Sequence, residues 1–301
     1  MGVVQGKVAV VTGSSQGLGK GIAMGLAMEG AKVITNNRKP GSEGGDAETA
    51  AKEIQAAGGE AFGVYADMSK FSDCEKLIKA AVEKYGRIDI LVNNAGIDRA
   101  KMVWNMAEED WDFLLDTVLK GAFSCTRFAS GYMRDQKWGR IINITSDAYR
   151  GTVGHVNYGA SKAGLVGLTR ACALELGRSS VTCNAIAPTA RTRMTASPEV
   201  EAGLRKRVET GVMSKAAFED FLHMGGPEHI APFVVFLCTD AAANINGRTF
   251  NVTGGKVALY SEPEETRAIF KKEGIWTQAE LLDLIPKTVA QGLVNPAPPQ
   301  K

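Results

Sequence analysis

Short apolar runs rich in β-branched residues alternate along the chain with longer stretches in which apolar residues recur at helical spacing. Each short run predicts a buried strand, and there are seven, at residues 7–13, 31–37, 60–67, 88–94, 139–146, 181–188 and 248–255. The stretches between them predict helices at residues 17–29, 46–57, 72–85, 108–132 and 158–176. Because parallel strands need a crossover helix between them, this order predicts an α/β fold: a doubly wound, parallel, seven-stranded sheet with helices on both faces.

Two segments fall outside this alternation. Residues 188–227 carry no strand pattern but many apolar residues, which predicts a helical excursion over the site, with residues 190–225 as a substrate lid; surface helices over the sheet edge are the alternative. After residue 258 the pattern changes, and residues 266–284 predict two short helices, the second opened by a capping box of Thr277 and Glu280. We therefore expect a catalytic domain at 1–258 and a C-terminal helical extension and tail at 259–301.

Composition narrows the function classes. The chain has 301 residues with 45% hydrophobic content, enough for a large core, and a formal net charge of +2, too small to predict binding of nucleic acid or of an anionic membrane. Its five cysteines are widely spaced without a CxxC pair and its three histidines show no ligand spacing, which predicts reduced thiols, a cytoplasmic protein and no metal. Neither a signal peptide nor an apolar run approaching about 18 residues is evident, so no membrane span is expected.

A glycine-rich stretch, TGSSQGLG at residues 12–19, follows the first strand and opens the first helix. Glycines at 13, 17 and 19 let the backbone turn tightly and approach a pyrophosphate, which would lie on the free amides and the positive dipole end of that helix. In a doubly wound sheet, ligands bind beyond the carboxyl ends of the strands. The stretch therefore predicts a dinucleotide site.

A second stretch, YGASK at residues 158–162, opens a long helix. Positions i and i+4 share one helix face about 5 to 6 Å apart, so the Tyr158 hydroxyl and the Lys162 amine could act on one molecule. That geometry suits proton transfer, although a solvated surface pair is the alternative for these five residues taken alone.

The glycine stretch has three residues between its first two glycines, and together with several other positions it resembles the short-chain dehydrogenase/reductase family, which has a Rossmann-like fold. The resemblance runs over about residues 3–256. It is carried by Thr12, Gly13, Gly17, Gly19, Asp67, Asn93, Asn94, Ala95, Gly96, Ser146, Tyr158, Lys162, Pro188, Gly254 and Gly255.

This resemblance implies an oxidoreductase that moves hydride between a nicotinamide and a carbon bearing a hydroxyl or carbonyl. Ser146, Tyr158 and Lys162 would be catalytic: Tyr158 exchanges a proton with the substrate oxygen, Ser146 hydrogen-bonds that oxygen, and Lys162, with the oxidised nicotinamide, lowers the pKa of Tyr158 and binds the ribose. The residues implied to bind the cofactor are Gly13, Ser15, Gln16, Gly17, Leu18, Gly19, Asn37, Arg38, Asp67, Met68, Asn94, Ala95, Gly96, Tyr158, Lys162, Pro188, Thr189 and Thr192.

One position departs from the family. Where members usually carry an Asn that supports a proton-relay water, the segment TVLKGAF places Val118, whose side chain has no donor or acceptor. Either main chain and other groups hold the water, or turnover is slower, or the chain is a catalytically silent cofactor-binding subunit or redox sensor that supports an active partner.

The segment NAIAPTARTRMT at residues 184–195 looks like the dehydrogenase part of multifunctional β-oxidation enzymes, which act on 3-hydroxyacyl-CoA thioesters. By that likeness Thr192 would contact the nicotinamide carboxamide. Basic residues nearby could meet the phosphates of a CoA, although a solvated helix face is the alternative. These residues are Arg191, Arg193, Arg205, Lys206 and Arg207.

The residue at the end of the second strand bears on the choice of cofactor. Asn37 stands where NAD-preferring sheets place an acid, and Arg38 follows it, which favours NADP because a guanidinium pairs bidentately with a 2′-phosphate. NAD stays possible, since the insertion after Arg38 could bring Glu43 or Asp46 back to the ribose.

The remaining expectations concern substrate and assembly. The substrate is expected to be a bulky, mostly apolar secondary alcohol or ketone, such as a 3-oxoacyl thioester, a steroid or an alicyclic alcohol. By analogy with the family we expect a homo-oligomer, a tetramer or a dimer, formed through the helices at 108–132 and 158–176 and the last strand.

Overall fold

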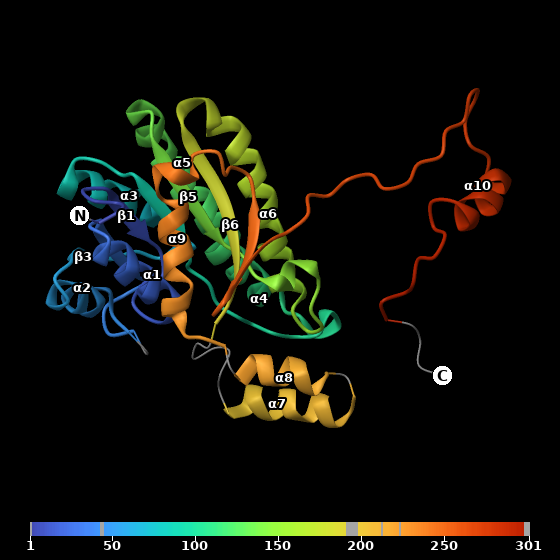
Figure 1. The fold of residues 1–301 in the computed structure, drawn as a ribbon, viewed down its shortest axis with the longest axis horizontal. Helices are drawn as coiled ribbons and strands as arrows, with labels where there is room; N and C mark the ends of the chain where they lie inside the picture. Colours follow the sequence, from blue (N-terminus) through green and yellow to red (C-terminus); the bar gives the residue numbers. More distant parts are fainter. Residues whose placement is uncertain (1, 43–44, 191–197, 212, 223, 298–301) are drawn as a thin grey trace. The chain divides into compact units, whose positions relative to one another are not determined.

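The computed structural model describes residues 2–42, 45–190, 198–211, 213–222 and 224–297. It contains two compact units, residues 1–260 and residues 261–301 (Figure 1). The first unit is built on one eight-stranded sheet in the order β3-β2-β1-β4-β5-β6-β7-β8. The strands are β1 (Val8–Val11), β2 (Lys32–Asn37), β3 (Glu60–Tyr65), β4 (Ile90–Asn93), β5 (Gly139–Ile144), β6 (Val181–Thr189), β7 (Thr249–Thr253) and β8 (Lys256–Leu259).

The first seven strands are parallel, and β8 pairs antiparallel with β7. The doubly wound fold is confirmed, but the predicted count of seven strands is wrong by one. The run read as a single strand at 248–255 ends at Thr253, and Gly254 and Gly255 turn the chain back into β8. Since three of the four residues of β8 are exposed, its pattern lacks the apolar run by which a buried strand is recognised.

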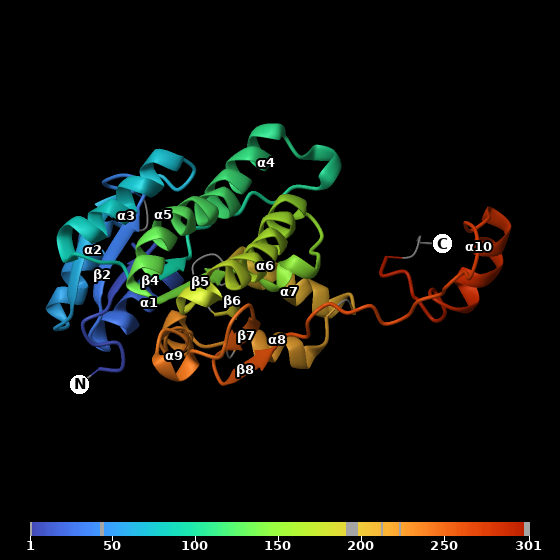
Figure 2. The same cartoon turned by 90° about the horizontal axis from the view of Figure 1, so that it is seen from above.

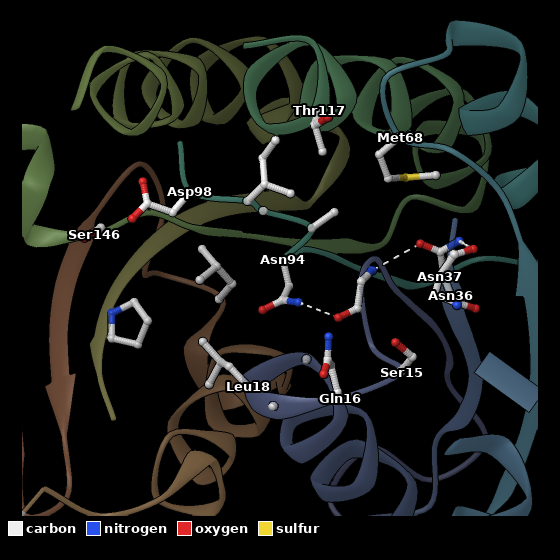
Figure 3. Close-up of a pocket in the computed structure, with 18 of the residues that line it drawn as sticks. Ser15, Gln16, Leu18, Asn36, Asn37, Met68, Asn94, Asp98, Thr117 and Ser146 are labelled. Atoms are coloured by element: carbon white, nitrogen blue, oxygen red, sulfur yellow. Dashed lines mark hydrogen bonds between the residues drawn. The ribbon is translucent and has the colours of Figure 1, made fainter. Parts of the chain in front are cut away.

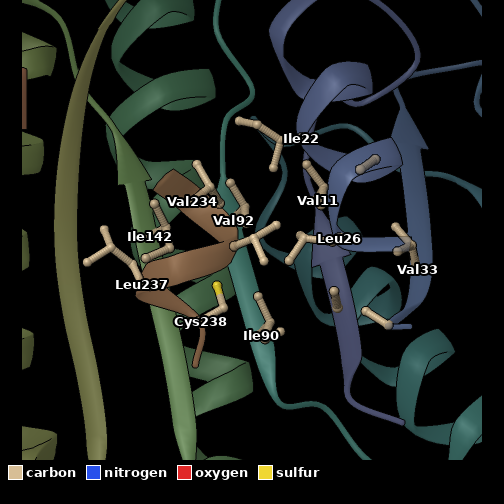
Figure 4. Close-up of a cluster of buried hydrophobic side chains, with 14 of the residues drawn as sticks. Val11, Ile22, Leu26, Val33, Ile90, Val92, Ile142, Val234, Leu237 and Cys238 are labelled. Atoms are coloured by element: carbon tan, nitrogen blue, oxygen red, sulfur yellow. The ribbon is translucent and has the colours of Figure 1, made fainter. Parts of the chain in front are cut away.

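Helices cover both faces of the sheet, as Figure 2 shows from above. The α-helices of the first unit are α1 (Gly17–Met28), α2 (Ala47–Ala56), α3 (Phe71–Tyr85), α4 (Glu108–Leu115), α5 (Gly121–Gln136), α6 (Val156–Leu176), α7 (Pro198–Glu209), α8 (Lys215–Leu222) and α9 (Ala231–Leu237). One face is covered by α1 and α9, whose apolar side chains pack on the alternate residues of the central strands (Figure 4). The opposite face is covered by α3, α5 and α6, which bury the apolar strand side chains that point to that face.

The long helix predicted at 108–132 is divided in the structure. A π-helical turn, Asp116–Lys120, separates α4 from α5, and α5 runs on to Gln136. At the start of α5, Gly121 packs so closely on the chain that an added Cβ would lie 2.7 Å from the carbonyl oxygen of Met68. π-turns occur mostly as single insertions in α-helices and often at functional sites.

The second unit holds a short helix, α10 (Gln278–Leu284), opened by the predicted capping box: Thr277 accepts from the backbone of Glu280, whose side chain accepts from the backbone of Thr277. The prediction of another helix before it is wrong, because residues 261–271 have no helical structure. The ammonium of Lys271 pairs with the carboxylate of Glu280 on α10.

Candidate active site

A cavity of about 900 Å³ opens at the carboxyl ends of the parallel strands, where β1 and β4, neighbours in space but not in sequence, lie side by side. This crevice is where doubly wound sheets bind ligands. Figure 3 shows residues from several strand ends pointing into it. Ser146 and all of the predicted cofactor residues line the cavity, except Thr192, which lies outside the described residues.

Three glycines of the turn after β1 resist a side chain, either through their backbone conformation or through close packing. Gly13 and Gly17 adopt positive φ angles of 61° and 53°, which L-residues with a Cβ rarely take. A Cβ added at Gly19 would lie 2.4 Å from the side-chain nitrogen of Asn94, and one at Gly13 would lie 2.9 Å from the Cα of Ala95. The turn therefore brings bare backbone against the cavity at the N-terminus of α1, as a pyrophosphate site requires.

Two asparagines hold this turn in place. Asn94, after β4, donates from Nδ2 to the carbonyl oxygens of Thr12 (2.9 Å) and Gly13 (3.0 Å). Asn36, on β2, accepts from the Gly13 amide (3.1 Å), and its Nδ2 donates to the carbonyl oxygens of Val64 and Ala66. Asn36 was missed in the sequence, where the only available signal was its place at a strand end.

The residues after β2 are the ones predicted to distinguish NADP from NAD. Asn37 lines the cavity, but its amide is engaged by the chain itself: Nδ2 donates to the Lys39 carbonyl (2.8 Å) and Oδ1 accepts from the Ala47 amide (3.0 Å). Asp46 accepts from the Tyr65 hydroxyl (2.8 Å), caps α2 and does not line the cavity, while Glu43 lies outside the described residues. Arg38 is exposed and does line the cavity.

Helix α6 carries the tyrosine and the lysine on one face. The Lys162 side chain is buried, its Nζ donates to the Ile144 carbonyl (2.7 Å), and that nitrogen lies 5.4 Å from the centre of the Tyr158 ring. Thr145 ties α6 to the end of β5 by donating from Oγ1 to the Lys162 carbonyl (2.8 Å). Ser146 follows on the same strand end, where its Oγ accepts from the Ala148 amide (3.2 Å), and its hydroxyl acts to lower the pKa of the Tyr158 phenol. The three predicted catalytic residues thus meet at one place in the cavity.

A family model described as short chain dehydrogenase matches residues 7–201. The chain belongs to the short-chain dehydrogenase family. It is 44% identical over 260 residues to a 3-oxoacyl-[acyl-carrier-protein] reductase of Synechocystis sp., which covers 85% of this chain and 99% of that one. It is 39% identical over 296 residues to a hydroxyacyl-CoA dehydrogenase of Mycobacterium tuberculosis, covering 92% and 87%. The crystal structure of a short chain dehydrogenase from Mycobacterium avium superposes with a TM-score of 0.81 at 35% identity over 99% of both chains.

This short-chain dehydrogenase is therefore an oxidoreductase of the family that uses a nicotinamide dinucleotide, and its cavity fits such a group. The fit lies in the glycine turn at the helix N-terminus and in a cavity of about 900 Å³ that both Arg38 and Ser146 line. Among the described residues, no helix is both long and apolar enough to cross a membrane. The predicted cytoplasmic location stays a prediction.

Burial governs the protonation of the dehydrogenase's tyrosine and lysine. Burial raises the pKa of Tyr158; the hydrogen bond from Ser146 acts in the opposite sense, and the charge of Asp98 adds a further rise. Burial lowers the pKa of Lys162 to about 8, so its ammonium is still mostly present at neutral pH. The predicted lowering of the Tyr158 pKa involves Lys162 together with an oxidised nicotinamide, and it stays a prediction.

Val118 lies away from the dehydrogenase's cavity. It is 2% exposed within the π-turn and packs in an apolar cluster with Leu114, Ala122 and Leu165, against which Tyr158 also rests. The residue before it, Thr117, lines the cavity instead. The position of the family's usual Asn is therefore part of the apolar support behind Tyr158.

Two residues that line the cavity, Asp98 and Arg99, were missed in the sequence. Asp98 and Arg99 follow the NNAG stretch and line the cavity, and Phe221 and Met224 reach it from the segment predicted as a lid. Only the position of Asp98 after a strand end could have marked it. The lid itself stays a prediction.

Of the basic residues considered for CoA phosphates, the three that the structure describes do not line the cavity. Arg205 pairs with Glu201 on α7 (3.1 Å), and Lys206 and Arg207 are exposed on the same helix. Arg191 and Arg193 lie outside the described residues. Their contact with a phosphate stays a prediction.

Proposed function

We propose that this dehydrogenase is an NADP-linked enzyme that reduces the ketone of 3-oxoacyl thioesters to a secondary alcohol, with Ser146, Tyr158 and Lys162 as its catalytic residues. The observation that carries the proposal is that these three side chains share one cavity with the bare glycine turn. Hydride transfer from a bound cofactor and proton transfer from a side chain can then take place at the same substrate carbonyl.

Each residue has a role that follows from its chemistry. A bound nicotinamide dinucleotide supplies or accepts the hydride. The Ser146 hydroxyl donates to the substrate oxygen and stabilises the negative charge that develops there. The Tyr158 phenol, kept protonated by its burial, donates its proton to that oxygen during reduction. The Lys162 ammonium places a positive charge 5.4 Å from the centre of the Tyr158 ring, and it would hold the ribose of a bound cofactor.

The thioester substrate class is supported by the names of the two relatives, one acting on acyl-carrier-protein thioesters and the other on a hydroxyacyl-CoA. The apolar side chains of Ile97, Phe221 and Met224 at the cavity suit the acyl part of such a molecule. Steroids and alicyclic alcohols would also find apolar surface there, so they belong in the substrate panel.

The preference for NADP is supported by the end of the cavity near β2. Arg38 offers a guanidinium there, and Asn37 in the acid's usual place brings no negative charge. The only carboxylates among the described lining residues are those of Asp67 and Asp98, and Asp98 lies at the opposite end from Asn36 and Asn37 (Figure 3).

The test is to mix the purified full chain with NADPH and a panel that includes acetoacetyl-CoA, and to follow the loss of the reduced nicotinamide absorbance. We expect turnover by the wild type and a loss of at least about 100-fold in Tyr158→Phe, since a positioned proton donor contributes that much or more. NADPH binding, measured by its fluorescence, should persist in the variant. Binding without turnover of any substrate by the wild type would favour the silent, cofactor-binding alternative.

A further inference from the structure

A phenylalanine on α4 contacts two arginines at the cavity. Phe113 lines the cavity, as do Arg38, which directly follows β2, and Arg99, which lies in the loop after β4. The Cζ atom of Arg99 lies 4.6 Å from the centre of the Phe113 ring, and the Cζ atom of Arg38 lies 6.0 Å from it. The ring thus joins the loops that follow two different strands of the sheet.

The packing of α4 fixes the place of this ring. Leu114, the next residue, is fully buried and packs in the apolar cluster with Val118 and Leu165 of α6. Thr117, four residues after Phe113, also lines the cavity. The helix therefore turns its apolar side to the protein interior and the Phe113 ring to the cavity.

The guanidinium of Arg99 is already paired. Its Nη1 donates to Oδ1 of Asp110 on α4 (2.7 Å), and Lys101 donates to the other oxygen of that carboxylate (2.6 Å). The Asn157 side chain holds the same loop by donating to the Arg99 carbonyl oxygen (3.2 Å). Arg99 is therefore a fixed neighbour of Phe113 whose charge is matched by a carboxylate.

Arg38 differs in that its guanidinium has neither an ion pair nor a hydrogen bond to any other residue that the structure describes, and Phe113 is its recorded contact. Its main chain is held by Asn37, which donates to the Lys39 carbonyl oxygen (2.8 Å) and accepts from the Ala47 amide (3.0 Å). A guanidinium stacks on an aromatic ring through its face, whereas its N–H donors lie in its own plane. Contact with the ring can thus orient Arg38 and leave its donors free for a phosphate.

Orienting this side chain before a ligand arrives affects affinity. An exposed arginine has many rotamers, and fixing one of them on a phosphate costs conformational entropy. A ring that already favours the right rotamer lowers that cost for a ligand that needs the guanidinium and for no other ligand. NADP and NAD differ only in the 2′-phosphate, so the effect of the ring should appear in the ratio of their affinities.

We propose that Phe113 is a specificity-determining residue for the cofactor, because its ring positions the Arg38 guanidinium to bind the 2′-phosphate of NADP. Phe113 acts through Arg38 and is therefore a positioning residue. The inference rests on the proposed preference for NADP and extends it to a residue of a different element, α4.

The experiment titrates the purified full chain with NADPH and with NADH and follows the nicotinamide fluorescence. We expect Phe113→Leu to weaken NADPH binding by about 2- to 5-fold, the value of an exposed cation–π contact, and to leave NADH binding unchanged. In a protein that already carries Arg38→Leu, adding Phe113→Leu should cause no further loss. Phe113→Tyr, which keeps an aromatic face, should retain the wild-type ratio. The matched control is Phe62→Leu, because the Phe62 ring lies 5.1 Å from the Lys84 ammonium and does not line the cavity.

The possible results separate this inference from the preference for NADP. If the wild type bound NADPH no better than NADH and Arg38→Leu changed neither affinity, both proposals would be overturned. If Arg38→Leu selectively weakened NADPH binding while Phe113→Leu kept the wild-type ratio, only the role of Phe113 would be overturned. Equal weakening of both dinucleotides by Phe113→Leu, or a further loss in the double variant, would show that the ring does not act through Arg38 and would overturn that role as well.

Discussion

At the scale of single residues, the site depends on side chains whose chemistry is set by burial. Lys162 shows this most plainly: its ammonium is buried and its pKa falls from 10.5 to about 8, yet the Ile144 carbonyl oxygen accepts its hydrogen bond. A buried cation costs stability, and active sites commonly carry that cost for function. The spacing of Tyr158 and Lys162 was readable in the sequence, but the degree of burial was not.

The lowered pKa of Lys162 predicts a pH-dependent stability difference. Between pH of about 8 and 10.5 the unfolded chain holds a proton that the folded chain has released, so this group opposes folding below that window and ceases to do so above it. Relative to Lys162→Met, the wild type should therefore gain up to about 3 kcal/mol of unfolding free energy between pH 7 and pH 10. Urea unfolding of both proteins at the two pH values measures this. Parallel pH dependences would contradict it.

Arg38 carries the prediction on cofactor choice. Replacing it by leucine should weaken NADPH binding by about 10- to 100-fold, the value of a charge-assisted hydrogen bond, and leave NADH binding nearly unchanged. The matched control is Lys39→Leu, because Lys39 neighbours Arg38 but does not line the cavity. Fluorescence titrations with both dinucleotides give the comparison. If NADPH and NADH binding weakened equally in Arg38→Leu, Arg38 would not be the residue that binds the 2′-phosphate.

At the scale of elements, the periodicity of the sequence was a good guide wherever a segment is buried on a regular face. The parallel strands and the helices α1, α2, α3 and α6 lie within a few residues of their predicted places. The errors lie where that signal is weak. The exposed β8 has no apolar run, and the π-turn between α4 and α5 changes hydrogen bonding without changing the apolar pattern.

At the scale of the whole molecule, exposed apolar residues on the long helices support the expected assembly. Phe123 on α5 and Leu174 on α6 are 48% and 84% exposed, although both helices also pack on the sheet. Burying such side chains against a second copy removes apolar surface from water, which favours association. We therefore propose a homo-oligomer formed through α5 and α6.

The assembly prediction is tested by Leu174→Glu, which would place a charge in the proposed interface. We expect a smaller particle in light scattering, because an unpaired charge buried between subunits is strongly unfavourable. Leu282→Glu on α10, where the leucine is 69% exposed, is the matched control in the second unit. A particle of unchanged mass in Leu174→Glu would exclude this surface of α6.

The sequence by itself determined the order of the buried strands and the glycine turn, because these follow from local periodicity or from spacing within one segment. The functional residues at the strand ends were identified through the resemblance to the family. Only the tertiary structure decided which of these residues meet. The packing of Val118 against Leu165 and the pairing of Asp98 with His155 both join segments distant in sequence. Such contacts depend on how helices and strands pack in three dimensions, and no local pattern encodes them.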